Sequence, residues 1–195
     1  MMFASAGIYR RFIASRRAVA AIEFAMIMPI LLLLFLGSFD AGNGISAYLK
    51  VRSATYVLAA ITNQYSTGQG AISSANMTAI TNATGAVLSP FPSSSAVVVI
   101  SQIKATSATQ STVSWSYAVN GTALTPGAPF NSLPTNFASN SCSTYPCYFI
   151  LASVTYSFTP SFGAFLTGPI NLSDSLYVTP RSSVCIQYNS LPASC

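Results

Sequence analysis

The chain has 195 residues, of which 51% are hydrophobic and only 6% are charged. A soluble domain usually carries about 25% charged residues, so the composition predicts a chain made partly for an apolar environment. The net charge of +5 does not indicate a nucleic-acid surface, because half of the basic residues are arginines clustered near the N-terminus. Histidine is absent and only three residues are acidic, which leaves little material for acid–base catalysis or a hard-metal site. We therefore expect no enzyme, no cofactor and no nucleic-acid partner.

An apolar run extends from Ala18 to Gly37, and Glu23 is its single ionisable residue. A helix of about 20 residues spans roughly 30 Å, the thickness of the hydrocarbon core of a bilayer. Pro29 is tolerated in such a helix, because its surroundings re-satisfy the freed carbonyl. Four arginines precede the run and no Lys or Arg follows before Lys50. The positive-inside rule then predicts a cytoplasmic N-terminus and an extracytoplasmic remainder.

Two simpler interpretations of this run stay open. One is a secretory signal peptide, although the apolar core of a signal peptide is usually about 7–15 residues long. The other is a plain membrane anchor in which Glu23 snorkels toward the cytoplasmic face. An acid at the centre of a spanning helix costs about 2.5–3.5 kcal/mol and less near its edge, so neither interpretation explains why a glutamate is there.

The stretch "SRRAVAAIEFAMIMPILLLLFLGSFDAG" resembles the N-terminus of TadE/TadG-like proteins of the tight-adherence pilus system. It is similar more broadly to type IV prepilins and pseudopilins. The matching features are an arginine pair, the small residue Ala18, four apolar residues and then Glu23-Phe24. A leucine-rich run with a proline follows, and then a glycine and the acid Asp40.

This resemblance implies a processing site and an assembly residue. In such prepilins a membrane aspartyl peptidase cuts before the apolar segment, which here is the bond between Ala18 and Val19. The family usually has glycine where this chain has Ala18, and alanine is the next smallest residue. Glu23 would become the fifth residue of the mature chain, followed by Phe24. Its carboxylate would neutralise the Val19 α-ammonium of a neighbouring subunit, and such a pair sets register in a low-dielectric bundle.

Beyond the apolar run, the sequence predicts more helix. Three glycines, Gly37, Gly42 and Gly44, predict a flexible spot. Apolar residues then recur at alternating spacings of four and three, at Ala47, Val51, Ala54, Leu58, Ile61 and Tyr65. This pattern is typical of an amphipathic helix, and an unbroken helix from Arg16 to Tyr65 would be about 75 Å long. The alternative is a short separate helix that lies on the domain. Residues 71–88 predict a second, weaker helix that ends before Pro90.

The rest of the chain predicts a small β-sheet. Four segments are rich in Val, Ile, Thr, Tyr and Phe, namely Val97–Lys104, Thr112–Val119, Tyr148–Phe158 and Leu176–Tyr188. Two long connections, residues 120–145 and 159–175, lack such a pattern. In the second, we expect Phe162, Phe165 and Leu166 to pack back onto the sheet, or alternatively to face a partner.

The predicted fold class is therefore α+β and pilin-like. A long N-terminal transmembrane and amphipathic helix is followed by a small antiparallel β-sheet domain, one face of which the helix covers. The expected organisation is a basic cytoplasmic leader (1–18), a transmembrane helix (19–39), an amphipathic helical region (40–90) and a β-rich extracytoplasmic domain (91–195).

All four cysteines, Cys142, Cys147, Cys185 and Cys195, lie in this last part. In an oxidising compartment we expect them to form disulfides. One possible pattern joins Cys142 to Cys147 and Cys185 to Cys195, but four cysteines allow three connectivities. A zinc site is the less favoured alternative, because the paired C-x2-C knuckles are missing.

The resemblance to TadE/TadG-like proteins implies a minor pilin or pseudopilin-like structural subunit of a tight-adherence (Flp-type) pilus assembly and secretion system. The resemblance places it in the bacterial inner membrane as a single-pass protein, with the C-terminal domain periplasmic or extracellular. The expected partners are the inner membrane, other pilin-like subunits, the pilus assembly platform and a prepilin peptidase. One alternative is a non-assembling, membrane-anchored binding module. Another is a secreted protein whose mature N-terminus follows Gly37.

Overall fold

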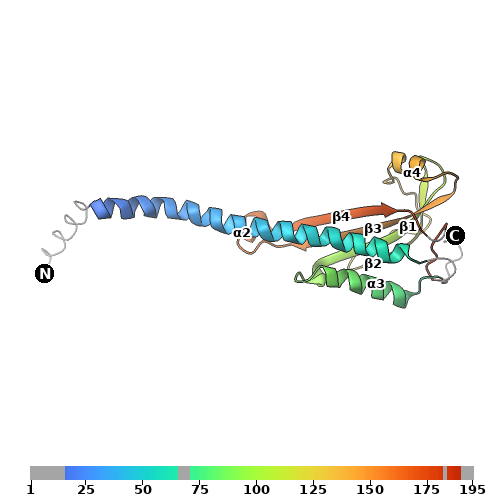
Figure 1. Cartoon of the computed structure of the whole chain (residues 1–195), viewed down its shortest axis with the longest axis horizontal. Helices are drawn as coiled ribbons and strands as arrows, with labels where there is room; N and C mark the ends of the chain where they lie inside the picture. The colour runs from blue at the N-terminus through green and yellow to red at the C-terminus, as the bar shows by residue number, and fades with distance from the viewer. Residues whose placement is uncertain (1–15, 66–70, 182–183, 190–195) are drawn as a thin grey trace. The chain divides into compact units, whose positions relative to one another are not determined.

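The computed structural model describes residues 16–65, 71–181 and 184–189 (Figure 1). Its elements are α2 (Arg16–Asn63), α3 (Ser74–Val87), the 3-10 turn η2 (Ser93–Ser95), β1 (Ala96–Ala105), β2 (Ser111–Val119), α4 (Thr135–Ser141), β3 (Cys147–Phe158), α5 (Ala164–Thr167) and β4 (Ile170–Val178). The chain divides into two compact units. The first comprises the chain up to Asn43 together with Pro160–Gly168, and the second comprises Gly44–Thr159 and the chain from Pro169 onward.

Helix α2 is a single element of 48 residues. It continues through Pro29 and through the three glycines, so the unbroken helix is confirmed, while the flexibility expected at the glycines stays a prediction. A glycine costs only about 1 kcal/mol relative to alanine inside a helix. Helix propagation is cooperative, so the long helical segments on both sides carry the backbone through these positions.

The second unit is built on a four-stranded antiparallel sheet with the order β2-β1-β3-β4. This confirms the predicted α+β class. The first three strands coincide with the predicted segments to within a residue or two. The fourth prediction was wrong, because β4 pairs with β3 over Ile170–Val178 and not over residues 176–188.

The main core lies between one face of the sheet and the helices α2 and α3, which Figure 1 shows on the same side. The predicted helix face is buried: Ala47, Val51, Ala54 and Leu58 are all at most 1% exposed. Buried threonines on the same helices satisfy their hydroxyls within the helix. The Oγ1 atoms of Thr55 and Thr62, for example, donate to the carbonyls four residues earlier.

The connection 120–145, which had no clear pattern in the sequence, packs on the opposite face of the sheet. Its Leu124, Phe130 and Leu133 contact a second cluster of buried residues. The main-chain N–H of Phe130 donates to the carbonyl of Ser111, and α4 follows. A register shift between Gln102 and Ile103 in the pairing of β1 with β2 separates the two clusters. Ile103 and its partner Val113 belong to the second cluster, whereas Trp115, the partner of Gln102, belongs to the main core.

The chain after β4 adds one more buried segment, which corrects the predicted end of the last strand. Residues 185, 186 and 188 are buried, and Tyr188 forms a parallel bridge with Ile72. The indole Nε1–H of Trp115 donates to the carbonyl of Ile186 at 2.7 Å, and the amide of Ile186 donates to Gln102 Oε1 at 2.8 Å. These contacts are made by side chains and by a single bridge, so the segment is not a fifth strand of the sheet.

Candidate functional site

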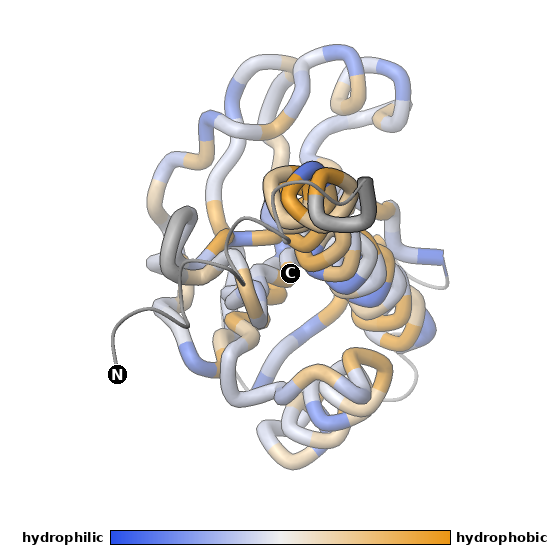
Figure 2. Tube along the Cα trace, turned by 90° about the vertical axis from the view of Figure 1, so that its left-hand side faces the viewer, coloured by the Kyte–Doolittle hydropathy of each residue, from blue (hydrophilic) through white to orange (hydrophobic). Residues whose placement is uncertain are grey.

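The apolar part of α2 is the first candidate site. Its large side chains from Val19 to Phe35 are between 46% and 73% exposed. The helix from Val19 to Asn63 contains an 18-residue stretch with a mean hydropathy of 2.6, which makes it a candidate membrane span by length and composition. In Figure 2 the nearer turns of α2 are hydrophobic, and hydrophilic residues alternate with hydrophobic ones farther along the helix.

Most of the predicted processing and assembly residues lie on described turns of this helix. Glu23 is exposed, Phe24 is 62% exposed and Val19 is 50% exposed. Val19 and Glu23 are four residues apart, so they lie on the same face of the helix, one above the other. The side chain of Ala18 is outside the described residues, although its backbone is helical.

Asp40, one turn beyond the apolar run, holds a distant loop. Its carboxylate accepts hydrogen bonds from the main-chain N–H groups of Ser161 at 2.9 Å, Phe162 at 2.9 Å and Gly163 at 2.6 Å. Asp40 is only 9% exposed. A Cβ atom at Gly163 would lie 3.3 Å from Asp40 Oδ2, so the glycine permits this close approach. We call this arrangement the Asp40 clamp.

The clamp was not predicted from the sequence. Asp40 was noted only as an acid of the family pattern, and its donors are main-chain groups that carry no side-chain signal. The sequence offered one hint, since Asp40 is the only charged residue between Glu23 and Lys50.

The clamped loop, Pro160–Gly168, presents an aromatic ring beside α2. The rings of Phe162 and Phe39 meet edge to face, with their centroids 5.8 Å apart. Both rings are about half exposed, at 54% and 51%. Phe162 therefore contacts α2, which corrects the expectation that it packs on the sheet. Phe165 and Leu166 carried the same expectation, and their side chains lie outside the described residues.

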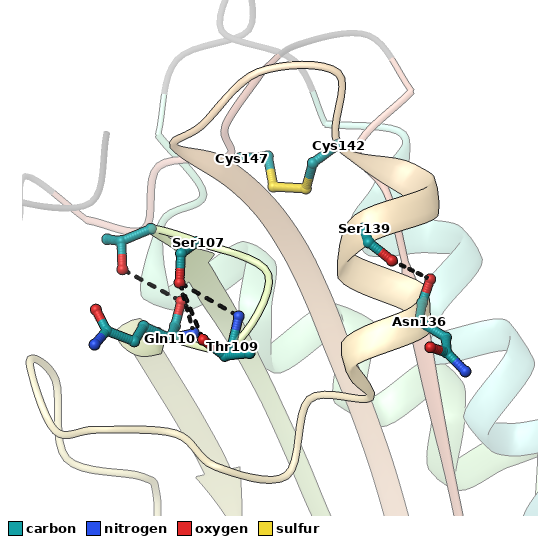
Figure 3. The surroundings of a disulfide bond; sticks show 8 residues. Ser107, Thr109, Gln110, Asn136, Ser139, Cys142 and Cys147 are labelled. Atoms are coloured by element: carbon teal, nitrogen blue, oxygen red, sulfur yellow. Dashed lines mark hydrogen bonds between the residues drawn. A yellow bond between two sulfur atoms is a disulfide. The ribbon is translucent and has the colours of Figure 1, made fainter.

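A disulfide joins Cys142, at the end of α4, to Cys147, at the start of β3, with the Cα atoms 6.0 Å apart (Figure 3). The hairpin between β1 and β2 lies nearby in Figure 3, and in it Ser107 Oγ accepts from the main-chain N–H of Gln110 at 3.0 Å. The bridge closes a small loop and holds α4 over the buried ring of Phe149. Cys185 is buried and disulfide-bonded, and Cys195 lies outside the described residues.

A cavity of about 450 Å³ opens between α3, η2 and the ends of β1 and β2, and its lining side chains are uncharged. Within residues 16–65, 71–181 and 184–189, no group of three Cys, Asp or Glu side chains is placed to hold a metal ion.

On the part of α2 that belongs to the second unit, the exposed side chains of Arg52 and Tyr56 contact each other. The guanidinium carbon of Arg52 lies 5.9 Å from the centroid of the Tyr56 ring. A hydrogen bond with Tyr56 is the main cause that raises the pKa of Arg52 above its usual value. Arg52 is charged at any physiological pH, with or without this contact. The pair therefore orients the Arg52 side chain and does not act as a pH-dependent switch.

Comparison with known proteins adds one match. Residues 18–59 match the model of the family described as TadE-like protein, which is about a fifth of the chain. The match begins at the predicted processing position and includes Glu23 and Asp40. No curated protein and no solved structure matches the chain. The predicted resemblance is thereby confirmed: over residues 18–59, this chain is similar to the TadE-like family.

Proposed function

We propose that this protein is a minor pilin or pseudopilin-like structural subunit of a tight-adherence pilus assembly and secretion system. The observation that carries the proposal is the TadE-like match over residues 18–59, which indicates a protein associated with this pilus system. The exposed apolar helix supports it, since such a surface needs lipid or other helices to cover it.

The proposed topology is that of a single-pass protein of the bacterial inner membrane. Residues 1–18 form a cytoplasmic leader, residues 19–39 cross the bilayer, and residues 40–195 fold on the extracytoplasmic side. Four arginines before the span support this orientation by the positive-inside rule. The disulfide between Cys142 and Cys147 fits an oxidising compartment.

In the proposed assembly step, a prepilin peptidase cuts between Ala18 and Val19 and creates an α-ammonium at Val19. Val19 and Glu23 are separated by about one helical turn, or about 6 Å along the axis. A parallel neighbouring helix displaced by this distance brings its Glu23 level with the first Val19. In a low-dielectric bundle a charge left without its partner is strongly destabilising, by about 3–5 kcal/mol. Charge pairing thus favours one stagger between neighbours.

The first experiment identifies the N-terminal residue of the protein isolated from its native membrane, by mass spectrometry of the terminal peptide. We expect the chain to begin at Val19. Ala18→Leu should block processing, whereas Ala18→Gly should be processed at least as fast as the natural chain. A natural chain that retains its leader would contradict the processing step and favour a non-assembling anchored module. A chain that begins after Gly37 would instead support the secreted-protein alternative.

The second experiment tests the charge pair with Glu23→Leu. We expect the variant to float with membranes as well as the natural protein does, because the new residue is apolar. Its recovery with other pilin-like subunits after crosslinking should be lost. Met26→Leu, an apolar change at a residue that is 73% exposed on the same segment, is the matched control and should assemble normally. Normal assembly of Glu23→Leu would refute the proposed role.

A further inference from the structure

We infer that the clamped loop, Pro160–Gly168, is a membrane-interface anchor whose Phe162 ring inserts among the lipids at the extracytoplasmic end of the span. The inference rests on the proposed function in one respect, namely that residues 19–39 cross a bilayer. The loop would then be a second point of contact with lipid, supplied by a part of the chain that follows three of the four strands.

The position of the loop along α2 is the first argument. The proposed span ends at Phe39, and the next residue, Asp40, accepts three main-chain hydrogen bonds from the loop. Three such bonds fix the loop at the turn of α2 where the apolar run ends. Hydrogen bonds to an ionised acceptor are roughly twice as strong as those between neutral groups.

The chemistry of the exposed surface is the second argument. Phe39 and Phe162 form an edge-to-face pair with both rings about half exposed. The exposed apolar surface of α2 consists of the large side chains from Val19 to Phe35, and this aromatic pair extends it. If residues 19–39 cross the bilayer, the apolar surface of α2 faces lipid. The adjoining Phe39 and Phe162 rings would then be covered by the same bilayer. Aromatic and apolar residues of interfacial segments are buried about 5–10 Å into the boundary between headgroups and acyl chains.

The charge balance of the loop is the third argument. Residues 160–168 contain no Lys, Arg, Asp or Glu. The one nearby carboxylate, that of Asp40, is 9% exposed and is compensated by the three N–H donors of the clamp. Two further main-chain amides of the loop are paired, since those of Thr167 and Gly168 donate to the carbonyls of Gly163 and Ala164. Paired polar groups are what an element near the hydrocarbon region requires.

The test places a fluorescent reporter at Phe162 in the full-length chain. Phe162→Trp is reconstituted into phosphatidylcholine vesicles, either plain or with brominated acyl chains. The natural Trp115 is fully buried and provides a constant background. Tyr56→Trp is the matched control, because Tyr56 is 48% exposed but lies on α2 in the second unit.

We expect the emission added at position 162 to be shifted to shorter wavelength and to fall about twofold in brominated vesicles, as fits a ring at interfacial depth. The emission added at position 56 should change little. Adding Asp40→Ala to Phe162→Trp should release the loop and reduce the quenching toward that of the control. If Asp40→Ala does not fold, the comparison of positions 162 and 56 decides the question alone.

Flotation of the same vesicles after a high-pH carbonate wash separates the two claims. A chain that does not float refutes the proposed span and with it the anchor. A chain that floats while position 162 is quenched no more than position 56 refutes the anchor only. A blue shift at position 162 that depends on protein density in the vesicles, without quenching, would mean that a second copy covers Phe162, and it would also overturn the inference.

Discussion

Replacing Trp115 by phenylalanine is expected to lower the free energy of unfolding of the second unit by about 2–4 kcal/mol. Trp115 is 0% exposed, and its Nε1–H donates to the carbonyl of Ile186 at 2.7 Å. Its ring centroid lies 5.4 Å from that of Tyr188. The side chain therefore joins β2 to the buried segment that follows β4.

Two losses make up this magnitude. Phenylalanine cannot donate, so the Ile186 carbonyl, on a residue that is 2% exposed, loses this partner at a cost of about 1–3 kcal/mol. The smaller ring also leaves part of the indole volume empty, which adds about 1 kcal/mol. For a domain of this size each kcal/mol shifts Tm by about 2–4 °C, so Tm should fall by about 5–15 °C.

Scanning calorimetry of the full-length chain in detergent micelles measures this shift. Val184→Ala is the control, since Val184 lies next to the same segment but is 76% exposed. It should change the stability by less than about 0.5 kcal/mol. A loss below about 1 kcal/mol for Trp115→Phe would show that the indole does not hold this segment and would refute the reasoning.

Two other predictions concern stability. Replacing both Cys142 and Cys147 by serine should lower the free energy of unfolding by about 2 kcal/mol. The loss is modest because a bridge across so short a loop removes little entropy from the unfolded chain. The same calorimetry checks this, and an unchanged Tm would contradict it. Burial raises the pKa of Tyr156 and Tyr177 above their usual value. The unfolded chain then loses these protons first as the pH rises above about 10. The stabilising contribution of the buried neutral phenols is complete below that pH and is lost as the pH rises through the folded-state pKa values. A Tm series from pH 8 to pH 11 should therefore fall less steeply above about pH 10 for Tyr177→Phe than for the natural chain, and an identical decline would contradict the assignment.

Helix α2 was predictable from the sequence because its signals are local. An apolar run and an alternating three–four spacing identify the exposed and buried faces without any knowledge of the rest of the chain. Ala47, Val51, Ala54 and Leu58 are all buried as this spacing predicts. The first three strands are rich in β-branched and aromatic residues, which is also a local property.

Strand β4 was misplaced because tertiary context decides it. Its first half, "INLSDS", has little β propensity. It nevertheless pairs with β3, beginning at Ile170, which lies opposite Phe158. An available strand edge outweighs weak propensity. Residues 185–188 looked like a continuation of the strand, but their partners are Ile72 and the side chains of Gln102 and Trp115.

The candidate sites divide in the same way. Ala18 and Glu23 belong to a contiguous pattern, so the sequence alone was enough to propose them as site residues. The Asp40 clamp pairs one carboxylate with main-chain amides 121 to 123 residues farther along the chain. No residue type at positions 161–163 is required to donate a main-chain N–H group, so only the folded chain reveals this contact.

The buried segment that follows β4 has a consequence for biosynthesis. Three of the partners that hold it, Ile72, Gln102 and Trp115, precede it in the chain by more than seventy residues. On the proposed topology the chain is exported with its N-terminal helix in the membrane, so this segment arrives after these partners and after all four strands. Until it arrives, the indole N–H of Trp115 cannot donate to the Ile186 carbonyl, and Gln102 Oε1 cannot accept from the Ile186 amide. The core around Trp115 therefore closes only after this segment is exported, and a chain interrupted before the segment would be distinguishable by the water-exposed ring of Trp115.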